Sequence, residues 1–106
     1  MARALINVPQ KARRGEIIEI RTLIQHPMET GYRVGYNGTL IARDIIQTFS
    51  CAWNGVEIFR SEMSSAIAAN PFLSFTTVAT ETGEVTFRWT GDNGFEATEV
   101  ARITVE

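Results

Sequence analysis

The feature that most constrains this chain is the dipeptide Asn54-Gly55, which separates two runs of alternating apolar residues. Asn-Gly in this setting predicts a β-hairpin with a type I′ turn, because both central residues of that turn need a positive φ. The turn would set the cross-strand pairs, which are Trp53 with Val56, Cys51 with Ile58, and Phe49 with Arg60. The residues expected to share the inner face are Ile45, Phe49, Cys51, Trp53, Val56 and Ile58.

Period-two alternation also marks the segment Ile17 to Gln25 as a strand. The residues on its inner face are Ile18, Ile20, Thr22 and Ile24. Ile17 and Leu23 lie on the opposite face together with the charged Glu19 and Arg21. Two apolar residues on a nominally polar face indicate that this second face is partly covered.

Other elements follow from alternation and from turn residues. Strands are expected at 3–8, 44–53, 72–80, 84–90 and 95–105, with Val85, Phe87 and Trp89 on one face of their strand. Ser61–Ala69 has helix propensity and predicts one helical turn with Ser61 as its N-cap. The glycine-rich segment 28–43 is expected to be a long loop with a short hairpin at Tyr36-Asn37-Gly38.

About seven short strands in 106 residues predict an all-β fold, an immunoglobulin-like antiparallel two-sheet sandwich. A small barrel is the alternative. The length predicts a single domain spanning residues 1–106. The 44% hydrophobic content suffices for a core without a metal or disulfide, and a single Cys forms no internal disulfide.

Composition disfavours two classes of partner. The net charge of −2 lacks the basic surplus typical of nucleic-acid binders, so no nucleic-acid partner is expected. No apolar run approaches the roughly 18 residues of a membrane span, so no membrane partner is expected either. The N-terminal segment MARALINVPQKARRG has no apolar region of a secretory signal.

The residues that suggest chemistry are few, and each is explained by structure. His26 is the only His and is expected to pack or hydrogen-bond locally before Pro27. The hairpin register places Cys51 inward, where a thiol behaves as a small hydrophobe. Asp92-Asn93-Gly94 lacks the acidic spacing of a calcium loop and is expected to form a turn. Trp53 and Trp89 alternate in phase with core residues. No catalytic residue, metal ligand or cofactor is therefore predicted.

Four motifs are distinctive in combination: HPMETGYR (26–33), RDII (43–46), NPFLSFTTVA (70–79) and WTGDNG (89–94). Together with the segments ARALINVP and ARITV near the two ends, they resemble the SoxZ family. The resemblance covers essentially the whole chain. It implies a non-catalytic subunit of the bacterial sulfur-oxidising (Sox) system. Such chains pair with a SoxY subunit, which carries intermediates of thiosulfate oxidation on a Cys in its C-terminal Gly-rich arm.

The resemblance also implies a periplasmic location, with export alongside the partner, and transient contacts with other Sox enzymes. This chain ends VARITVE, without a Gly-Gly-Cys-Gly-Gly arm, so it is similar to the half of the carrier that does not bear sulfur. Aromatic, Met and Arg side chains are enriched at interfaces. The predicted partner interface is Met28, Tyr32, Arg33, Tyr36, Phe72 and Phe75.

Phe72 and Phe75 fall on opposite faces of one strand, so we expect one of them to face outward. The residues leave two other classes of function open. One is a standalone immunoglobulin-like module that binds protein or sugar. The other is an enzyme on a similar sandwich, such as an iron superoxide reductase, whose site needs several His ligands where this chain has one His.

Overall fold

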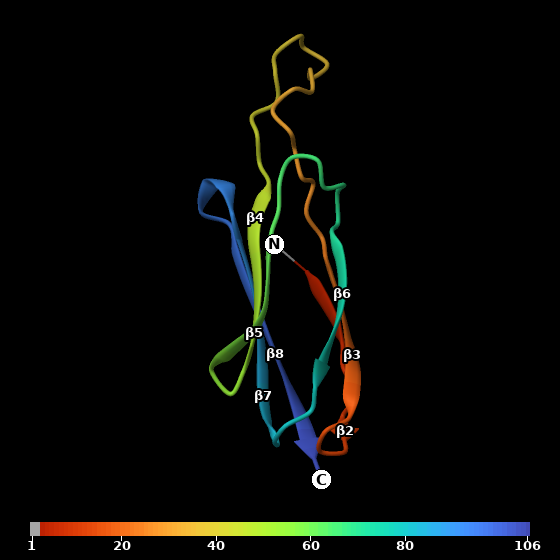
Figure 1. Cartoon of the computed structure of the whole chain (residues 1–106). Helices are drawn as coiled ribbons and strands as arrows, with labels where there is room; N and C mark the ends of the chain where they lie inside the picture. The colour runs from red at the N-terminus through yellow and green to blue at the C-terminus, as the bar shows by residue number, and fades with distance from the viewer. Residues whose placement is uncertain (1–2) are drawn as a thin grey trace.

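A computed structural model describes residues 3–106, and its strands form two sheets packed face to face (Figure 1). The small sheet has the order β1-β3-β6 and the larger sheet has the order β2-β8-β7-β4-β5. The strands of the small sheet are β1 (Ala4–Asn7), β3 (Ile17–Ile24) and β6 (Phe72–Val78). The strands of the larger sheet are β2 (Lys11–Ala12), β4 (Ile46–Trp53), β5 (Val56–Glu62), β7 (Gly83–Gly91) and β8 (Glu96–Val105).

The two-sheet, all-β sandwich predicted from the sequence is confirmed. Within the described part of the chain there are eight strands, one more than expected. The additional strand is β2, which lies between the strands expected at 3–8 and 17–25. It pairs in parallel with the end of β8, joining Lys11 to Thr104 and Ala12 to Val105, whereas the other strand pairs are antiparallel. Two residues are too few for a periodic signal, so only the tertiary pairing reveals this strand.

The core lies between the inner faces that the alternation predicted. Ile18, Ile20, Thr22 and Ile24 of β3 are all buried. Phe49 of β4 is the centre of an aromatic cluster, with its ring centroid 5.1 Å from that of Trp89 and 6.2 Å from that of Phe75 in the opposite sheet. The expected inner face of β7 is also confirmed, as Val85, Phe87 and Trp89 are each at most 1% exposed.

The Asn54-Gly55 hairpin is confirmed, but its predicted register is wrong from Cys51 onward. Both turn residues have positive φ, and Trp53 pairs with Val56. A β-bulge then inserts one extra residue, so that the actual pairs are Cys51 with Phe59 and Phe49 with Ser61. The bulge turns Phe59 inward, where its ring stacks on Phe75 at 4.2 Å. Val56, expected in the core, is 67% exposed.

The helical turn predicted at Ser61–Ala69 is also wrong. β5 continues through Glu62, and the next residue extends the pairing, because the Met63 N–H donates to the Gln47 carbonyl at 2.8 Å. A single turn follows, in which the Ala66 N–H donates to Ser64 Oγ at 3.2 Å. Ser64 rather than Ser61 therefore caps the turn, since pairing with β4 outweighs local helix propensity.

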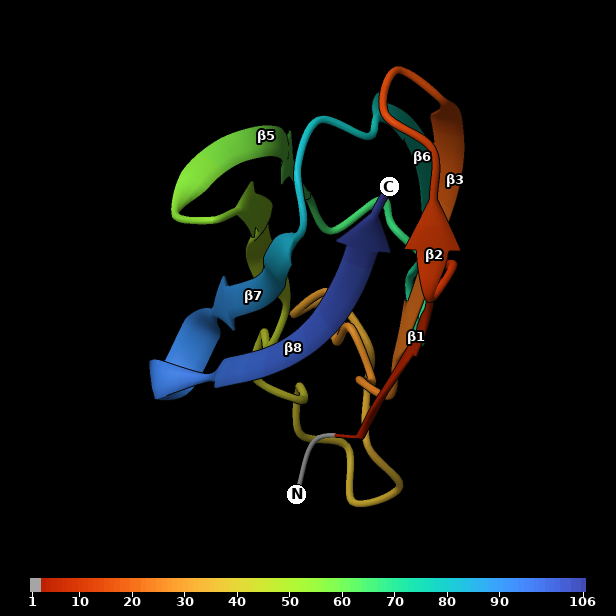
Figure 2. The same ribbon diagram turned by 90° about the horizontal axis from the view of Figure 1, so that it is seen from below.

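The long loop, residues 25–45, extends from one end of the sandwich (Figure 1). The molecule measures 58 × 20 × 19 Å, and its radius of gyration of 16.1 Å exceeds the roughly 13 Å typical of a chain this size. The expected hairpin at Tyr36–Gly38 is confirmed, as the Gly35 N–H donates to the Thr39 carbonyl at 2.8 Å and Val34 forms a bridge with Leu40. Viewed from below, β5 and β7 lie on one side and β1, β3 and β6 on the other, while β8 curves across from the first side and β2 lies beside its end (Figure 2).

Candidate docking surfaces

The base of the long loop is held by buried contacts. Met28 has φ 50° and is 4% exposed, and its Sδ accepts a hydrogen bond from the Ile46 N–H at 3.2 Å. Two backbone hydrogen bonds of 2.8 Å pair Glu29 with Asp44 across the two arms of the loop. The loop therefore leaves the sandwich from a fixed base rather than from a flexible hinge.

His26 belongs to this base. Its Nδ1 accepts a hydrogen bond from the Met28 N–H at 3.0 Å, so the neutral ring carries its proton on Nε2. Nε2 lies 3.6 Å from Asp44 Oδ1, and the ring packs edge-on against Phe95 with centroids 4.7 Å apart. The local packing and hydrogen bonding predicted for His26 are confirmed, and its side chain holds the loop rather than facing solvent.

Asp92 ties the loop to the turn between β7 and β8. Its carboxylate accepts hydrogen bonds from the Arg43 guanidinium at 2.9 Å, from the Ile45 N–H at 3.1 Å and from the Gln47 amide. The Arg43 hydrogen bond is the main reason that the pKa of Asp92 is lowered. The predicted turn at Asp92–Gly94 is confirmed as a short 3₁₀ segment, η1. The anchoring role of Asp92 was missed, since its partners lie more than 40 residues away in sequence.

Cys51 is fully buried, and burial raises the pKa of its thiol to about 12. The inward position predicted from the hairpin is confirmed even though its cross-strand neighbour differs. Among the described residues there is no group of three or more His, Cys, Asp or Glu able to hold a metal ion. Nor do those residues contain a helix of the length and apolarity that membrane crossing requires.

The six residues predicted for a partner interface fall in three places. Met28 and Phe75 lie in the core of this chain, at 4% and 9% exposure, so they do not present a surface to a partner. Tyr32, Arg33 and Tyr36 lie near the loop tip, where the two Tyr side chains are almost fully exposed. Arg33 is tied to Glu29, since its Nε donates to Glu29 Oε2 at 3.1 Å, and this hydrogen bond lowers the pKa of the carboxyl.

Phe72 is the outward member of the Phe72/Phe75 pair, and it is 59% exposed on the outer face of the small sheet. Strand register places it in a row with Leu23 of β3 and Leu5 of β1. A second apolar pair, Ile17 with Val78, lies near the other end of the same face. The sequence signal for this surface was the presence of Ile17 and Leu23 on the nominally polar face of their strand.

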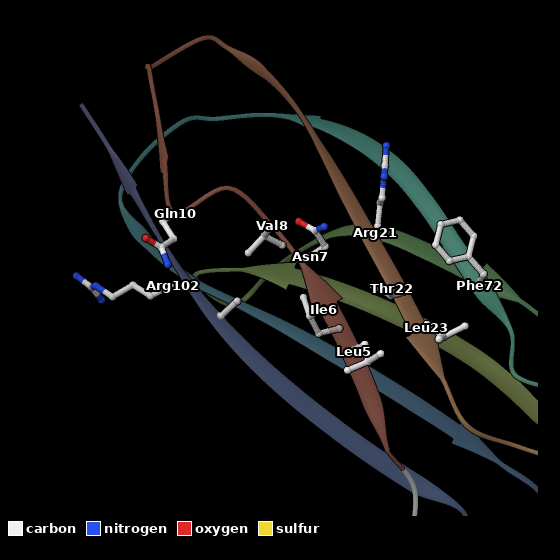
Figure 3. Close-up of a pocket in the computed structure, with 11 residues that line it drawn as sticks. Leu5, Ile6, Asn7, Val8, Gln10, Arg21, Thr22, Leu23, Phe72 and Arg102 are labelled. Atoms are coloured by element: carbon white, nitrogen blue, oxygen red, sulfur yellow. The ribbon is translucent and has the colours of Figure 1, made fainter.

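A groove of about 610 Å³ continues this face around the edge of the sandwich toward β8. Its lining residues come from β1, β3 and β6, from Val8 and Gln10 in the segment after β1, and from Ala101 and Arg102 of β8. Figure 3 shows the side chains of Leu5, Leu23 and Phe72 on three adjacent strands, with Arg102 across the groove on β8. The molecule thus has two exposed apolar surfaces, one at the loop tip and one on the small sheet.

These features define a class: an all-β, immunoglobulin-like sandwich domain with apolar surfaces of the kind used for protein contacts. Residues 6–102 match the family described as sulphur oxidation protein SoxZ. The chain therefore belongs to the SoxZ family and has a role in sulfur oxidation by the Sox system. No curated protein sequence matches the chain.

Several solved structures share the fold. A superoxide reductase (neelaredoxin) from Ignicoccus hospitalis is similar with a TM-score of 0.76 at 17% identity, over 97% of this chain and 80% of that one. The sulfur carrier protein SoxY from Chlorobium limicola f thiosulfatophilum is similar with a TM-score of 0.67 at 11% identity, over 96% of this chain and 74% of that one. At these identities the similarity shows the fold alone.

Proposed function

We propose that this chain is the non-catalytic subunit of a heterodimeric sulfur carrier in bacterial thiosulfate oxidation. Its partner is a SoxY-like chain that bears the sulfur intermediates on the Cys of a C-terminal arm. The observation that carries the proposal is the SoxZ family match over residues 6–102. In this role the chain stabilises the partner, covers its apolar surface and helps other Sox enzymes dock.

The structure supports this division of labour. The only thiol of the chain is buried and has a pKa of about 12, which makes it a poor attachment site for sulfur. The surfaces available for contact are apolar and well ordered at their base. The residues that we still predict to bind the partner are Tyr32, Arg33 and Tyr36 near the loop tip and Phe72 on the sheet face.

Co-expression with a SoxY-like chain that bears a C-terminal Gly-Gly-Cys-Gly-Gly arm tests the proposal. We expect one complex by size-exclusion chromatography, in which sulfur from thiosulfate is carried on the partner and none on this chain, as measured by intact mass. A matched partner whose arm Cys is replaced by Ser should still form the complex but carry no sulfur. A chain that stays monomeric beside the partner would instead indicate a standalone binding module.

The proposed location is the periplasm, reached by export together with the partner. Fractionation of cells that express both chains tests this part separately. We expect this chain in the periplasmic fraction when the partner has its own leader, and in the cytoplasm when that leader is deleted. Equal export in both cases would contradict co-export.

A further inference from the structure

The outer faces of the two sheets differ sharply in polarity. On the larger sheet, the outward residues of β7 are Glu84, Thr86, Arg88 and Thr90, and those that pair with them on β8 are Arg102, Val100, Thr98 and Glu96. Val100 is thus the one apolar residue among these eight, and Val56 in the edge strand β5 is the other strongly exposed apolar side chain of this sheet. This is the ordinary pattern of a sheet face in contact with water.

The outer face of the small sheet has a different composition. At one end Leu5, Leu23 and Phe72 form a continuous row across all three strands, and Leu5 and Phe72 are each 59% exposed. At the other end lie Ile17 and Val78, which are 70% and 47% exposed. Apolar groups at both ends of one rigid face indicate a surface that is covered in the working molecule.

The centre of this face carries one charge of each sign. Arg21 forms an ion pair with Glu19 at 2.8 Å, and Ser74 of β6 donates to the same carboxylate at 3.1 Å. These contacts with Arg21 and Ser74 lower the pKa of Glu19. Such a face, with one acid and one base at its centre and apolar residues at its ends, is complementary to a second face of the same pattern. When two such faces are related by a twofold rotation, the acid of each lies opposite the base of the other.

We propose that the outer face of the small sheet, with the adjoining groove toward β8, is the surface that binds the SoxY-like partner, sheet face against sheet face. The inference rests on the proposed function and adds the location of the interface. A partner of like fold suits this geometry, and the SoxY of Chlorobium limicola f thiosulfatophilum shares the sandwich fold over 96% of this chain. Two like-folded chains can pair through equivalent faces about an approximate twofold axis.

The size of the sheet face sets how much of the groove must take part. The three strands have four, eight and seven residues, which at about 3.3 Å per residue and about 4.8 Å between strands give a flat area of roughly 300 Å². A standard interface buries roughly 800 Å² on each partner, so a stable heterodimer needs the relief of the side chains and the adjoining groove as well as the face itself.

The chain offers a matched pair of variants for the test. Val78 and Val100 are both strand valines and are 47% and 55% exposed, but they lie on the outer faces of opposite sheets. We expect Val78→Asp and Phe72→Asp each to weaken binding of the purified SoxY-like partner at least ~30-fold, because each variant places a charge among apolar side chains that the partner covers. Val100→Asp should bind within about threefold of the unmodified chain, because surface substitutions outside an interface change little. Isothermal titration calorimetry measures the affinities, and circular dichroism verifies the fold of each variant.

The outcomes separate this inference from the proposed function. If the unmodified chain binds no SoxY-like partner, both are overturned. If it binds and the Val78 and Phe72 variants bind equally well, or if Val100→Asp weakens binding as much, only the location is overturned. Variants that alter self-association of this chain but not partner binding would assign the face to a second copy and also overturn it. Hydrogen exchange of the unmodified complex is a readout that needs no variant, with protection expected at residues 17–23 and 72–78.

Discussion

The buried position of Cys51 makes a quantitative prediction about thiol reactivity. Its side chain is fully buried, and burial raises the pKa of the thiol from 9.0 to about 12. Since the thiolate is the reactive form, at about pH 8 roughly 10% of an ordinary thiol of this kind is reactive, against about 0.01% of Cys51. Ionisation alone should therefore slow labelling about a thousandfold, and the lack of access slows it further.

Reaction with a polar aromatic disulfide reagent, followed by absorbance, measures this rate. A Thr98→Cys variant supplies a matched thiol on the exposed face of β8 in the same molecule. We expect the added thiol to label rapidly in the folded protein, with Cys51 labelling only after unfolding in guanidinium. Labelling of Cys51 at a rate similar to that of the thiol at position 98 would refute the reasoning, and it would reopen the possibility that this chain itself carries sulfur.

Three further predictions concern the contacts that position the loop and the core. Asp92→Asn should lower the melting temperature at neutral pH, because it removes the ion pair with Arg43. The pKa of Asp92 is lowered in the folded state, so its contribution to the free energy of folding is present above pH 3.8 and is lost as the pH falls below that value. The melting temperatures of the two proteins should therefore converge in acid. Gly91→Ala would place a Cβ in steric conflict with the Ile45 carbonyl oxygen, and we expect the free energy of unfolding in urea to fall by about 1–3 kcal/mol, whereas an unchanged midpoint would contradict the close approach. Phe49→Ala should cost about 3–5 kcal/mol by the same measurement, because its fully buried ring joins the two sheets, and a loss below about 1 kcal/mol would contradict its central place in the core.

The sequence predicts the sandwich well because both sheets bury one face. A shift of one residue would put charged groups into the core, so buried and more exposed positions alternate along β3 and along most of β7. The same argument showed that one of Phe72 and Phe75 must face outward, and it marked Ile17 and Leu23 as unusual apolar residues on a polar face. The alternation could not predict that Leu23 and Phe72 form a row with Leu5. That row depends on strand order and register between segments far apart in the sequence, which no local pattern specifies.

The errors occur where tertiary contacts override local preference. The bulge in the hairpin inserts one residue, and it exchanges Ile58 for Phe59 opposite Cys51 because Phe59 then stacks on Phe75 of the other sheet. The segment after β5 has helix propensity, yet pairing with β4 satisfies its first backbone groups. Met28 was expected at an interface because it lies in a long loop, but its positive φ turns it back into the core.

The side chains that most suggest chemistry are those that the fold already uses. His26 accepts the Met28 N–H, Asp92 accepts three donors from the base of the loop, and Cys51 is enclosed in the core. A side chain held in this way is not free to bind a substrate without loss of the structure that positions it. The exposed apolar groups make few such contacts, and they lie on rigid elements, which lowers the entropic cost of binding a partner. For this reason we assign the work of the chain to its surfaces, and above all to the outer face of the small sheet.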